Sequence, residues 1–290
     1  MKFGICGIGN MGRNHLRICK KLESELKDFK LSALYDPNIE KYNDKELFLD
    51  QINELDAVLI CAPSDKHVDI SLELLKINKN LKLFIEKPID DDRIKALKLL
   101  VYSKNIFVGH IERFNPAVQK LKSMIDEKKI TGINLIRTRR LGNFVARSSD
   151  YVNLDLLVHD ADVANYLIDS KFDDHSLYTN KTRDDNKTDY ATLICKYKND
   201  QNTILLSEAS WVEPEKIRTL ELICNEGKYF LDYIKQEIQY ISYTGECEAV
   251  PVEKSEPLYE ELHSFVKFVR GEQPTGCHIV HALSALEMVS

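Results

Sequence analysis

Apolar residues in the first 110 positions form short continuous runs separated by amphipathic stretches. The run AVLICA (57–62) is almost wholly apolar, which is typical of a parallel strand buried on both faces. Four more runs predict strands: KFGIC (2–6), LSALYD (31–36), LKLFIE (81–86) and IFVGH (106–110). Helical patterns lie between them: Met11 to Leu22, a stretch after the N-cap residue Ser64 with Val68, Leu72 and Leu75 on one stripe, and DDRIKALKLLVY (91–102). This alternation predicts an α/β domain with a doubly wound parallel sheet, a Rossmann fold that binds nucleotides at the carboxyl ends of its strands.

The pattern changes after about residue 118, where strands follow one another with few helices between them. Six segments predict these strands: NLIRTRR, DYATLICKY, TILLSEAS, RTLELIC, KYFLDY and EIQYIS. Turns at 225–227 and 244–245 contain glycine and suit hairpins, so we expect a large, mostly antiparallel, open-faced sheet. One helix is predicted at 154–168, and two more near 257–270 and 279–289. We therefore predict two domains, a dinucleotide-binding domain at 1–117 and an α+β domain for substrate binding and oligomerisation at 118–290.

Composition narrows the class of protein. The 290 residues are 43% hydrophobic and 30% charged, as expected of a soluble globular chain with large cores. The net charge of -6 argues against a nucleic-acid partner. No window approaches the roughly 20 apolar residues that a membrane helix requires, and the start MKFGICGIGNMG is too short and glycine-broken for a signal peptide. Seven dispersed cysteines without a CxxC spacing indicate reduced thiols, so we expect a cytoplasmic protein.

A glycine-rich motif, GIGNMG (7–12), directly follows the first predicted strand and opens the first predicted helix. Its glycines permit a tight turn, let the backbone approach a pyrophosphate and pack the helix close to the strand, while the helix N-terminus supplies N–H donors. Asp36 ends the second strand, where a carboxylate accepts hydrogen bonds from the ribose hydroxyls of NAD and repels a 2′-phosphate. We therefore predict NAD as the cofactor. The residues predicted to bind it here are Gly7, Gly9, Asn10, Met11, Gly12 and Asp36.

Charged residues end the fourth predicted strand, in FIEKPID (84–90). Lys87 lies at the carboxyl end of this strand, on the edge of the sheet where a nucleotide would bind. Pro88 excludes the helical conformation for Lys87 and so fixes its direction. An ordinary solvated lysine at a strand end is the alternative interpretation.

The motifs taken together resemble the glucose–fructose oxidoreductase and inositol dehydrogenase (Gfo/Idh/MocA) family. They are GxGxxG followed by His15, CAPSDKH (61–67), EKP (86–88) and a later DxxxH, and the similarity covers essentially the whole chain. The resemblance implies that Lys87 is a catalytic residue beside the nicotinamide, in an often cis Lys–Pro bond. It also implies that Asp155 and His159 are the catalytic aspartate and histidine. Further cofactor contacts are implied for Ala62, Pro63, Ser64, His67, Glu86 and Lys87.

Asp155 and His159 lie four positions apart, so a helix would place them on one face. Oxidation of a sugar hydroxyl removes a hydride from carbon and a proton from oxygen, and an imidazole accepts that proton near neutral pH. Lys87 would stabilise the developing alkoxide as an ammonium, or would itself be the base if its pKa is depressed, and the sequence leaves this choice open. Asp160 and Asp162 add acids that suggest a metal, but acids on a helix are usually solvent-facing and this oxidation needs no metal. We predict no metal site.

Two segments suggest the substrate class. VGHIERFNP (108–116) and RRLGNFVARSSD (139–150) are more similar to UDP-N-acetylglucosamine 3-dehydrogenases and their uronic-acid relatives than to inositol dehydrogenases. The family often has glycine just before the catalytic aspartate, where this chain has Tyr-Val-Asn-Leu (151–154). Arginines suit a diphosphate or carboxylate through bidentate contacts, and a solvated salt bridge is the alternative for each. The predicted substrate-binding residues are Lys87, Arg113, Asn115, Arg140, Arg147 and His159.

These inferences predict an NAD-dependent dehydrogenase that oxidises C3 of a UDP-N-acetylhexosamine, either UDP-GlcNAc or its uronic acid, to the 3-keto sugar. The resemblance implies a downstream pyridoxal phosphate (PLP) aminotransferase partner that makes an amino sugar for surface glycans. An inositol or simple-sugar dehydrogenase is one alternative, and a non-catalytic dinucleotide sensor is an alternative of another class. An uncovered face of the second sheet predicts a homodimer or homotetramer.

Overall fold

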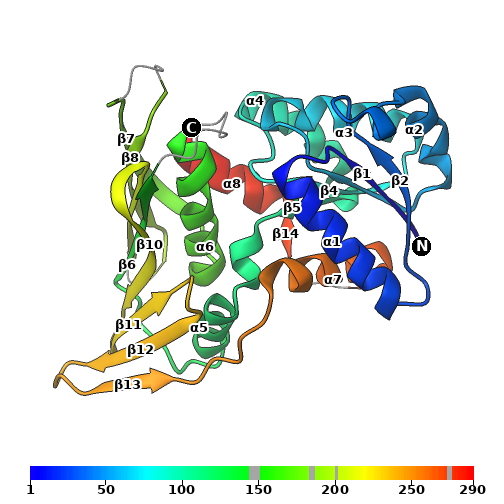
Figure 1. Cartoon of the computed structure of the whole chain (residues 1–290). Coiled ribbons are helices and arrows are strands. Elements are labelled where there is room, and N and C mark those ends of the chain that lie inside the picture. The colour runs from blue at the N-terminus through cyan, green and yellow to red at the C-terminus, as the bar shows by residue number, and fades with distance from the viewer. Residues whose placement is uncertain (144–150, 183–186, 200–201, 273–275) are drawn as a thin grey trace. The chain divides into compact units, whose positions relative to one another are not determined.

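The computed structural model describes residues 1–143, 151–182, 187–199, 202–272 and 276–290 (Figure 1). They form two compact units, the first of residues 1–111 with 258–283 and the second of residues 112–257 with 284–290. Arg147, a predicted substrate ligand, lies outside the described residues. In the described part of the chain, no helix combines the length and the hydropathy that a membrane crossing requires.

The first unit is built on a six-stranded sheet in the order β14-β5-β4-β3-β1-β2. Its strands are β1 (Lys2–Cys6), β2 (Lys30–Tyr35), β3 (Ala57–Ile60), β4 (Lys82–Glu86), β5 (Ile106–Gly109) and β14 (Cys277–His278). Its helices are α1 (Asn10–Glu25), α2 (Lys45–Gln51), α3 (His67–Ile77), α4 (Arg93–Ala96) and α7 (Pro257–Val269). Strands β1 to β5 pair in parallel. The predicted Rossmann sheet is confirmed, and its strand order reverses between β1 and β3, the place where such sheets bind nucleotides.

The C-terminal segment completes this first sheet. Strand β14 pairs antiparallel with β5. Phe265 of α7 packs with its ring centroid 5.4 Å from that of Phe84 and 5.6 Å from that of Phe107. Aromatic packing of this kind stabilises a core through large buried area and edge-to-face contacts. The compact units therefore differ from the contiguous domains predicted at 1–117 and 118–290, because edge pairing and aromatic packing join α7 and β14 to the first sheet.

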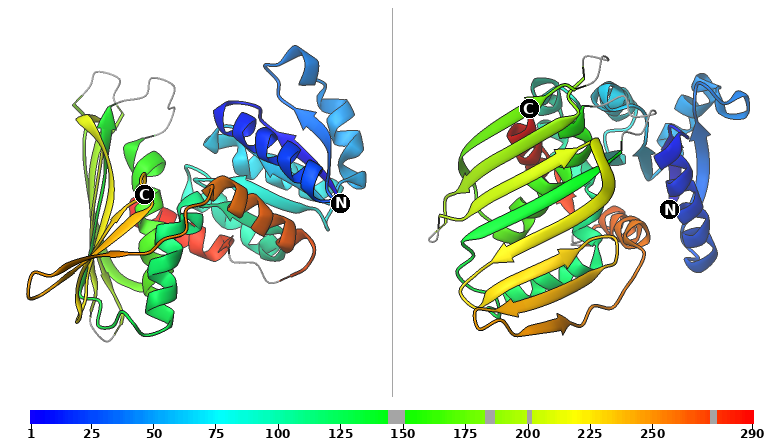
Figure 2. Two further views of the ribbon diagram at one scale, coloured as in Figure 1. Left: turned by 60° about the horizontal axis from the view of Figure 1, so that its bottom comes forward. Right: turned by 60° about the vertical axis from the view of Figure 1, so that its left-hand side comes forward.

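The second unit contains an eight-stranded sheet in the order β13-β12-β11-β10-β6-β9-β8-β7. Its strands are β6 (Leu135–Asn143), β7 (Phe172–Asn180), β8 (Tyr190–Tyr197), β9 (Ile204–Ser210), β10 (Val212–Ile223), β11 (Gly227–Asp232), β12 (Glu237–Ser242) and β13 (Cys247–Val250). All neighbours pair antiparallel except β6 and β9. Helices α5 (Pro116–Asp126) and α6 (Val158–Ile168) lie on one face of this sheet (Figure 2). The predicted open-faced, mostly antiparallel sheet is confirmed. Helix α8 (Ile279–Val289) ends the chain.

Two predicted helices have different geometry in the structure. DDRIKALKLLVY forms only the short α4, and a 3₁₀-helix follows over Leu97–Asn105 with non-helical angles at Tyr102. The helix predicted at 154–168 begins as a π-helix over Asn153–Leu157 before α6 continues it to Ile168. Single π-helical turns of this kind occur frequently at functional sites. Asp155 lies in the π-helical turn and His159 in α6, so the predicted catalytic pair spans the junction.

Candidate functional site

The glycine-rich loop between β1 and α1 has the shape that a pyrophosphate needs. Gly7 has φ +93°, and a Cβ there would lie 2.6 Å from the backbone nitrogen of Ala62. A Cβ on Gly12 would overlap the carbonyl oxygen of Gly7, so this glycine lets α1 pack against the loop. A Cβ on Gly9 would meet no atom within 4 Å. The loop is therefore closed behind Gly7 and Gly12 and open at Gly9, where the N-terminus of α1 presents its N–H groups.

Asp36 is tied to this loop. Its carboxylate accepts hydrogen bonds from the backbone N–H of Ile8 (2.6 Å) and of Asn38 (2.8 Å), and the residue is 8% exposed. One bond goes to each oxygen, and a carboxylate offers about four acceptor positions. The remaining positions are available to ribose hydroxyls, so the loop and Asp36 fit the predicted NAD site.

A buried, hydrogen-bonded pair of side chains lies at the carboxyl end of β4. His15 of α1 and Glu86 are both buried, with His15 Nε2 2.5 Å from Glu86 Oε1. The other carboxylate oxygen accepts the backbone N–H of Lys87 (3.1 Å). Burial by itself raises the pKa of Glu86. The hydrogen bond and charge of His15 and the charges of Lys87 and His67 outweigh burial, so the pKa of Glu86 is lowered. Glu86 thus positions the backbone of Lys87, and its predicted contact with the cofactor stays a prediction.

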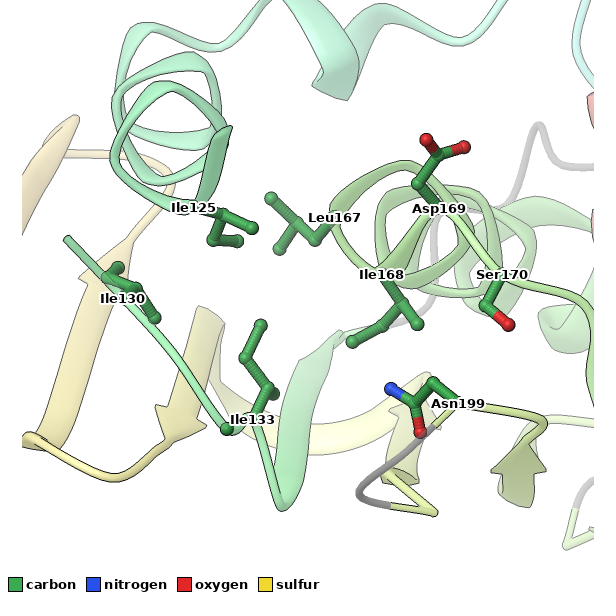
Figure 3. Close-up of a pocket in the computed structure, with 9 residues that line it drawn as sticks. Ile125, Ile130, Ile133, Leu167, Ile168, Asp169, Ser170 and Asn199 are labelled. Carbon is green, nitrogen blue, oxygen red and sulfur yellow. The ribbon is translucent and has the colours of Figure 1, made fainter. Parts of the chain in front are cut away.

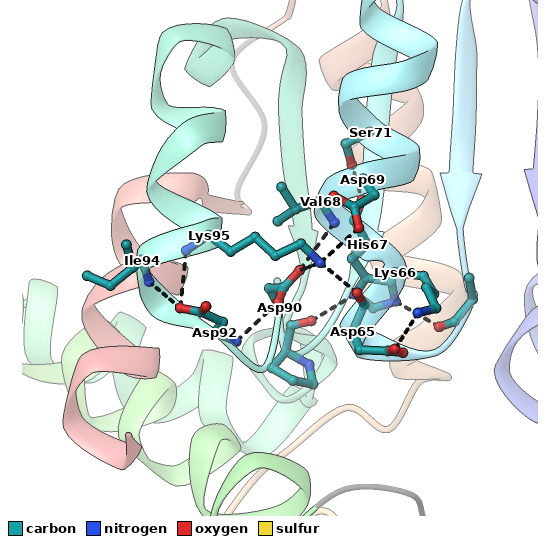
Figure 4. Close-up of polar contacts among 12 residues, drawn as sticks. Asp65, Lys66, His67, Val68, Asp69, Ser71, Asp90, Asp92, Ile94 and Lys95 are labelled. Atoms are coloured by element: carbon teal, nitrogen blue, oxygen red, sulfur yellow. Dashed lines mark hydrogen bonds and ion pairs between the residues drawn. The ribbon is translucent and has the colours of Figure 1, made fainter.

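His67 links the two motifs CAPSDKH and EKP. Its Nδ1 lies 2.9 Å from the carbonyl oxygen of Pro88 and its Nε2 lies 2.8 Å from that of Ala62 (Figure 4). The Lys87–Pro88 bond is cis, as the resemblance implies. Because β1, β3 and β4 are parallel, Lys87 lies at the same edge of the sheet as the glycine-rich loop and Ala62. Pro63 and Ser64, also predicted to contact the cofactor, lie in the turn between Ala62 and His67.

The predicted catalytic pair of the second unit is half-buried. The backbone N–H of Asp155 donates to the carbonyl of Tyr151 (2.9 Å), which forms the first turn of the helical segment. The side chain of Asn153 donates to the carbonyl of Val289 (2.7 Å) and accepts from the hydroxyl of Thr188 (2.9 Å). These bonds fix the segment that directly precedes Asp155.

Two arginines pair with acids of α6. Arg113 makes a bidentate contact with Asp162, with both N···O distances 2.7 Å, and both side chains are buried. Arg140 of β6 lies 3.1 Å from Asp160. The expectation that Asp160 and Asp162 face solvent is wrong, because each is the partner of a buried guanidinium. The bidentate pair suits the planar guanidinium, whose donors match carboxylate geometry.

Arg140 has two further neighbours. Its Nη1 donates to Glu112 (2.7 Å), and its guanidinium lies 4.8 Å from the centroid of the Tyr233 ring. Burial alone lowers the pKa of Arg140. The charges of Asp160 and Glu112 outweigh burial and hold this pKa above its ordinary value. Both arginines therefore orient α6 within the second unit, and their direct contact with a substrate stays a prediction.

Asn115 has a structural position. It is the N-cap of α5, where its side-chain oxygen accepts from the backbone N–H of Ala117 (3.1 Å). Its amide nitrogen donates to the carbonyl of Tyr233 (3.0 Å), and the residue is buried. Cap residues of this kind satisfy N–H groups that the helix leaves without partners. The predicted contact between Asn115 and a ligand stays a prediction.

One charged residue, on the face of the sheet that also carries Arg140, was not predicted from the sequence. Arg218 of β10 lies opposite Arg140 in register and is half-buried. The alternation in RTLELIC was sufficient to place its side chain on the face of the apolar residues Leu220 and Leu222. The proximity of Arg218 to Arg140 follows only from the pairing of β10 with β6, which the sequence did not predict.

A hollow in the second unit lies at the other end of α6. It has a volume of about 390 Å³, and Figure 3 shows its lining side chains. The residues that line it are Ile125, Ile130, Gly132, Ile133, Leu167, Ile168, Asp169, Ser170 and Asn199. No predicted site residue is among them. Asp155 and His159 belong to the N-terminal end of the helical segment, so we place the candidate site there.

Comparisons with known proteins agree with this arrangement. A family model described as the oxidoreductase family with an NAD-binding Rossmann fold matches residues 1–110. A second, described as the GFO/IDH/MocA C-terminal domain, matches residues 118–230. The chain belongs to the Gfo/Idh/MocA oxidoreductase family. It is therefore an oxidoreductase whose cofactor is NAD, and the prediction drawn from the motifs is confirmed.

Individual relatives of this family member act on different substrates. The chain is 24% identical to a UDP-N-acetylglucosamine 3-dehydrogenase from Acidithiobacillus ferrooxidans over 96% of this chain and 91% of that protein. It is 22% identical to a myo-inositol 2-dehydrogenase from Thermotoga maritima over 94% of this chain and 90% of that protein. A solved structure of the Acidithiobacillus enzyme superimposes with a TM-score of 0.85 and covers 99% of this chain and 94% of its own. This similarity establishes the fold, and the two sequence identities are too close to decide the substrate.

Proposed function

We propose that this protein is an NAD-dependent dehydrogenase that oxidises the C3 hydroxyl of a UDP-N-acetylhexosamine to the 3-keto sugar. The observation that carries the proposal is the position of Lys87. Glu86 and His67 hold the backbone of Lys87 and Pro88 at the sheet edge that also carries the glycine-rich loop and Asp36. A dinucleotide sensor has no need of a fixed cation at that edge, whereas a dehydrogenase uses one where charge develops on the substrate oxygen.

The proposed oxidation breaks two bonds of the substrate, the C–H bond of the carbinol carbon and the O–H bond of its hydroxyl group. Bound NAD would supply the acceptor for the hydride of the carbinol carbon. The hydroxyl oxygen of the substrate must lose its proton as its carbon becomes a carbonyl. We assign this proton to the imidazole of His159, which Asp155 assists, and we assign stabilisation of the alkoxide to the ammonium of Lys87. Gly9 and the N-terminus of α1 hold the pyrophosphate, and Asp36 holds the adenosine ribose.

The substrate assignment rests on similarity over nearly the full length of the chain to the Acidithiobacillus UDP-N-acetylglucosamine 3-dehydrogenase. Two segments, 108–116 and 139–150, supported the same subgroup from sequence. An inositol dehydrogenase is the second candidate, because the Thermotoga myo-inositol 2-dehydrogenase matches over a comparable length. A 3-keto sugar is a substrate for transamination by an amino donor, so we also propose that a PLP aminotransferase consumes the product.

A substrate panel tests this proposal. Purified protein is incubated with NAD and, separately, UDP-GlcNAc, UDP-N-acetylglucosaminuronic acid, myo-inositol and free N-acetylglucosamine, and reduced nicotinamide is followed. A PLP aminotransferase with an amino donor is added in a parallel set, because a tightly bound keto product would otherwise stop turnover. We expect reduction of NAD with a UDP-sugar. Reduction with myo-inositol alone would favour the second candidate, and cofactor binding without any turnover would favour a sensor.

A further inference from the structure

Arg218 lies on the face of the large sheet that packs against α6, because its register partner Arg140 pairs with Asp160 of that helix. It pairs with Arg140 across β10 and β6, and it shares its face with the buried side chains of Leu220 and Leu222. Side chains of directly opposed residues point to the same face, so two guanidinium groups lie next to each other there. Like charges in such a pair destabilise a sheet unless other groups compensate them.

Among the described residues, carboxylates form ion pairs with Arg140 and none forms an ion pair with Arg218. Arg140 has Asp160 and Glu112 within ion-pair distance. Two other arginines of β6, on the opposite face, also have acids: Arg137 lies 2.7 Å from Glu221, and Arg139 lies 3.1 Å from Glu208. Among the described residues, no carboxylate lies within 4.0 Å of the Arg218 guanidinium. It is the exception among the arginines of these two strands.

The orientation of Arg218 is nevertheless fixed. Its Nη1 donates to the carbonyl oxygen of Ile217 (2.8 Å) and to that of Leu141. Within the described part of the chain, its Nε and Nη2 make no hydrogen bond. Gly142 adjoins it, and a Cβ built there would lie 3.9 Å from Nη1, so any side chain at 142 would contact the guanidinium. Nη1 of the guanidinium is thus anchored to the backbone, and the two nitrogens Nε and Nη2 remain as donors for a ligand.

Burial and a neighbouring cation both disfavour the charged form of Arg218. Burial and the positive charge of Arg140 lower the pKa of Arg218, while the charges of Asp160, Glu112 and Asp155 act in the opposite direction. Arg140, its neighbour in register, pairs with Asp160, which directly follows His159 in α6, so Arg218 lies near the part of α6 that carries the predicted catalytic histidine. A bound anion would offset both the burial of this cation and its repulsion from Arg140.

We propose that Arg218 is the anion-recognition residue of the substrate site and that its Nε and Nη2 donate to two oxygen atoms of a phosphate or carboxylate group of the substrate. Arginine is suited to this contact because its planar donors match two acceptor oxygens at once. The inference rests on the proposed function and deepens it, since a nucleotide sugar carries such a group and inositol does not. Arg140, held by Asp160 and Glu112, is then a positioning residue for the surface on which Arg218 lies.

Binding measurements separate the possible ligands. Calorimetric titrations of the NAD-bound protein use UDP-GlcNAc, UDP, free N-acetylglucosaminuronic acid and neutral N-acetylglucosamine. We expect Arg218→Gln to raise the Kd of anionic ligands by about 10- to 100-fold, the usual effect of losing hydrogen bonds to a charged group, and to leave the neutral sugar unaffected. A loss confined to UDP ligands identifies the phosphate as the bound group, and one confined to the uronic acid identifies the carboxylate. Arg137→Gln, the same change on the opposite face, should leave every Kd unchanged.

Arg218→Lys is a second variant that tests the inference if Arg218→Gln does not fold. It keeps the charge and loses the paired planar donors, so we expect an intermediate Kd for the anionic ligands. An unchanged Kd in a folded Arg218 variant, equal weakening of neutral and anionic ligands, or no binding of any anionic ligand to wild type would overturn the inference. Turnover is measured separately: oxidation of a UDP-sugar with binding independent of Arg218 keeps the proposed function and removes this inference. Arg218-dependent binding without oxidation keeps this inference and removes the proposed function.

Discussion

Lys87 and His159 have different chemical tasks in the proposed reaction, and their replacement separates those tasks from folding. Lys87→Met keeps most of the stem volume and removes the charge, and His159→Asn keeps polarity and removes the base. We expect each change to lower kcat by on the order of 10²-fold or more, the usual contribution of a positioned proton-transfer group. NAD binding and the thermal unfolding midpoint should stay close to wild type.

Their combination tests whether the two groups serve one reaction. The double variant Lys87→Met/His159→Asn should lose far less activity than the product of the two single effects, because residues that act as a unit are strongly non-additive. Rates are compared at saturating NAD in single-turnover experiments. A Lys87→Met enzyme that oxidises its substrate at a near-normal rate would return Lys87 to the role of an ordinary strand-end lysine.

Asp36 should determine the choice between NAD and NADP. Its carboxylate is fixed next to the glycine-rich loop through Ile8, so it should accept ribose hydroxyls and repel a 2′-phosphate. We expect Asp36→Ala to weaken NAD by about 10-fold or more and to narrow the preference over NADP, as measured by fluorescence titration of both cofactors. Asp56→Ala is the control, since Asp56 accepts the backbone N–H of Lys2 at the opposite end of β1. Wild-type preference for NADP would contradict this role.

Single residues were predictable from sequence where their role depends on the local backbone. Gly7 and Gly12 are required by the turn itself, and the structure bears out the close contacts that they permit. The partners of Arg140 and Asp160 were not predictable, because they come together only when β6 and α6 pack. The same reason explains why Arg218 was overlooked.

At the scale of secondary structure elements, the His15–Glu86 pair connects α1 with the end of β4. The pKa of Glu86 is lowered in the folded protein, so its contribution to stability is present above the ordinary glutamate pKa and is lost as pH falls through the folded value. Glu86→Gln removes this titration and leaves His15 without its charged partner. Above about pH 5, we expect the free energy of unfolding of wild type to be larger than that of Glu86→Gln by on the order of 2 kcal/mol.

Denaturant unfolding from neutral to acidic pH measures this difference. The advantage of wild type over Glu86→Gln should shrink below about pH 4, as Glu86 becomes protonated. The comparison cancels the titration of other carboxylates, which both proteins share. A difference that stays constant with pH would show that the pKa of Glu86 is not lowered on folding.

Strands were predicted where their apolar pattern is strong and were missed where it is weak. Strand β3 is buried at every position and was evident, whereas β7 is exposed or half-buried at every position and lies at the sheet edge. Strand β13, at the other edge, is likewise little buried. Edge strands bury few side chains, so the alternation that identifies a strand is faint there. The π-helical turn at 153–157 has no such pattern at all.

At the scale of the whole molecule, the uncovered face of the second unit's sheet predicts self-association. Within this unit, α5 and α6 lie on one face only (Figure 2), and the opposite face exposes 62% of Tyr178 and 43% each of Ile194 and Ile204. We expect a homodimer or a tetramer through this face, with a mass in light scattering that is a multiple of 33.5 kDa. Ile194→Asp should shift the distribution toward monomer. A monomeric wild type at micromolar concentration would contradict this prediction.

The fold class of both units was predictable, because runs of apolar residues and hairpin turns are local properties of the chain. The return of α7 and β14 to the first sheet was not predictable, since it depends on pairing between β5 and a two-residue strand about 170 positions later. Substrate identity is harder still. It depends on which donors surround the ligand, and only the register between β10 and β6 brought Arg218 beside Arg140.

The most direct measurement of the central claim is the product of a single incubation with UDP-GlcNAc and NAD. The proposal predicts reduced nicotinamide together with a nucleotide sugar that has lost two hydrogen atoms, detected by mass spectrometry, and reduction of that ketone with borodeuteride should place deuterium at C3. The uronic acid form should give the same result if it is the preferred substrate. Oxidation of myo-inositol with both nucleotide sugars left unchanged would contradict the account.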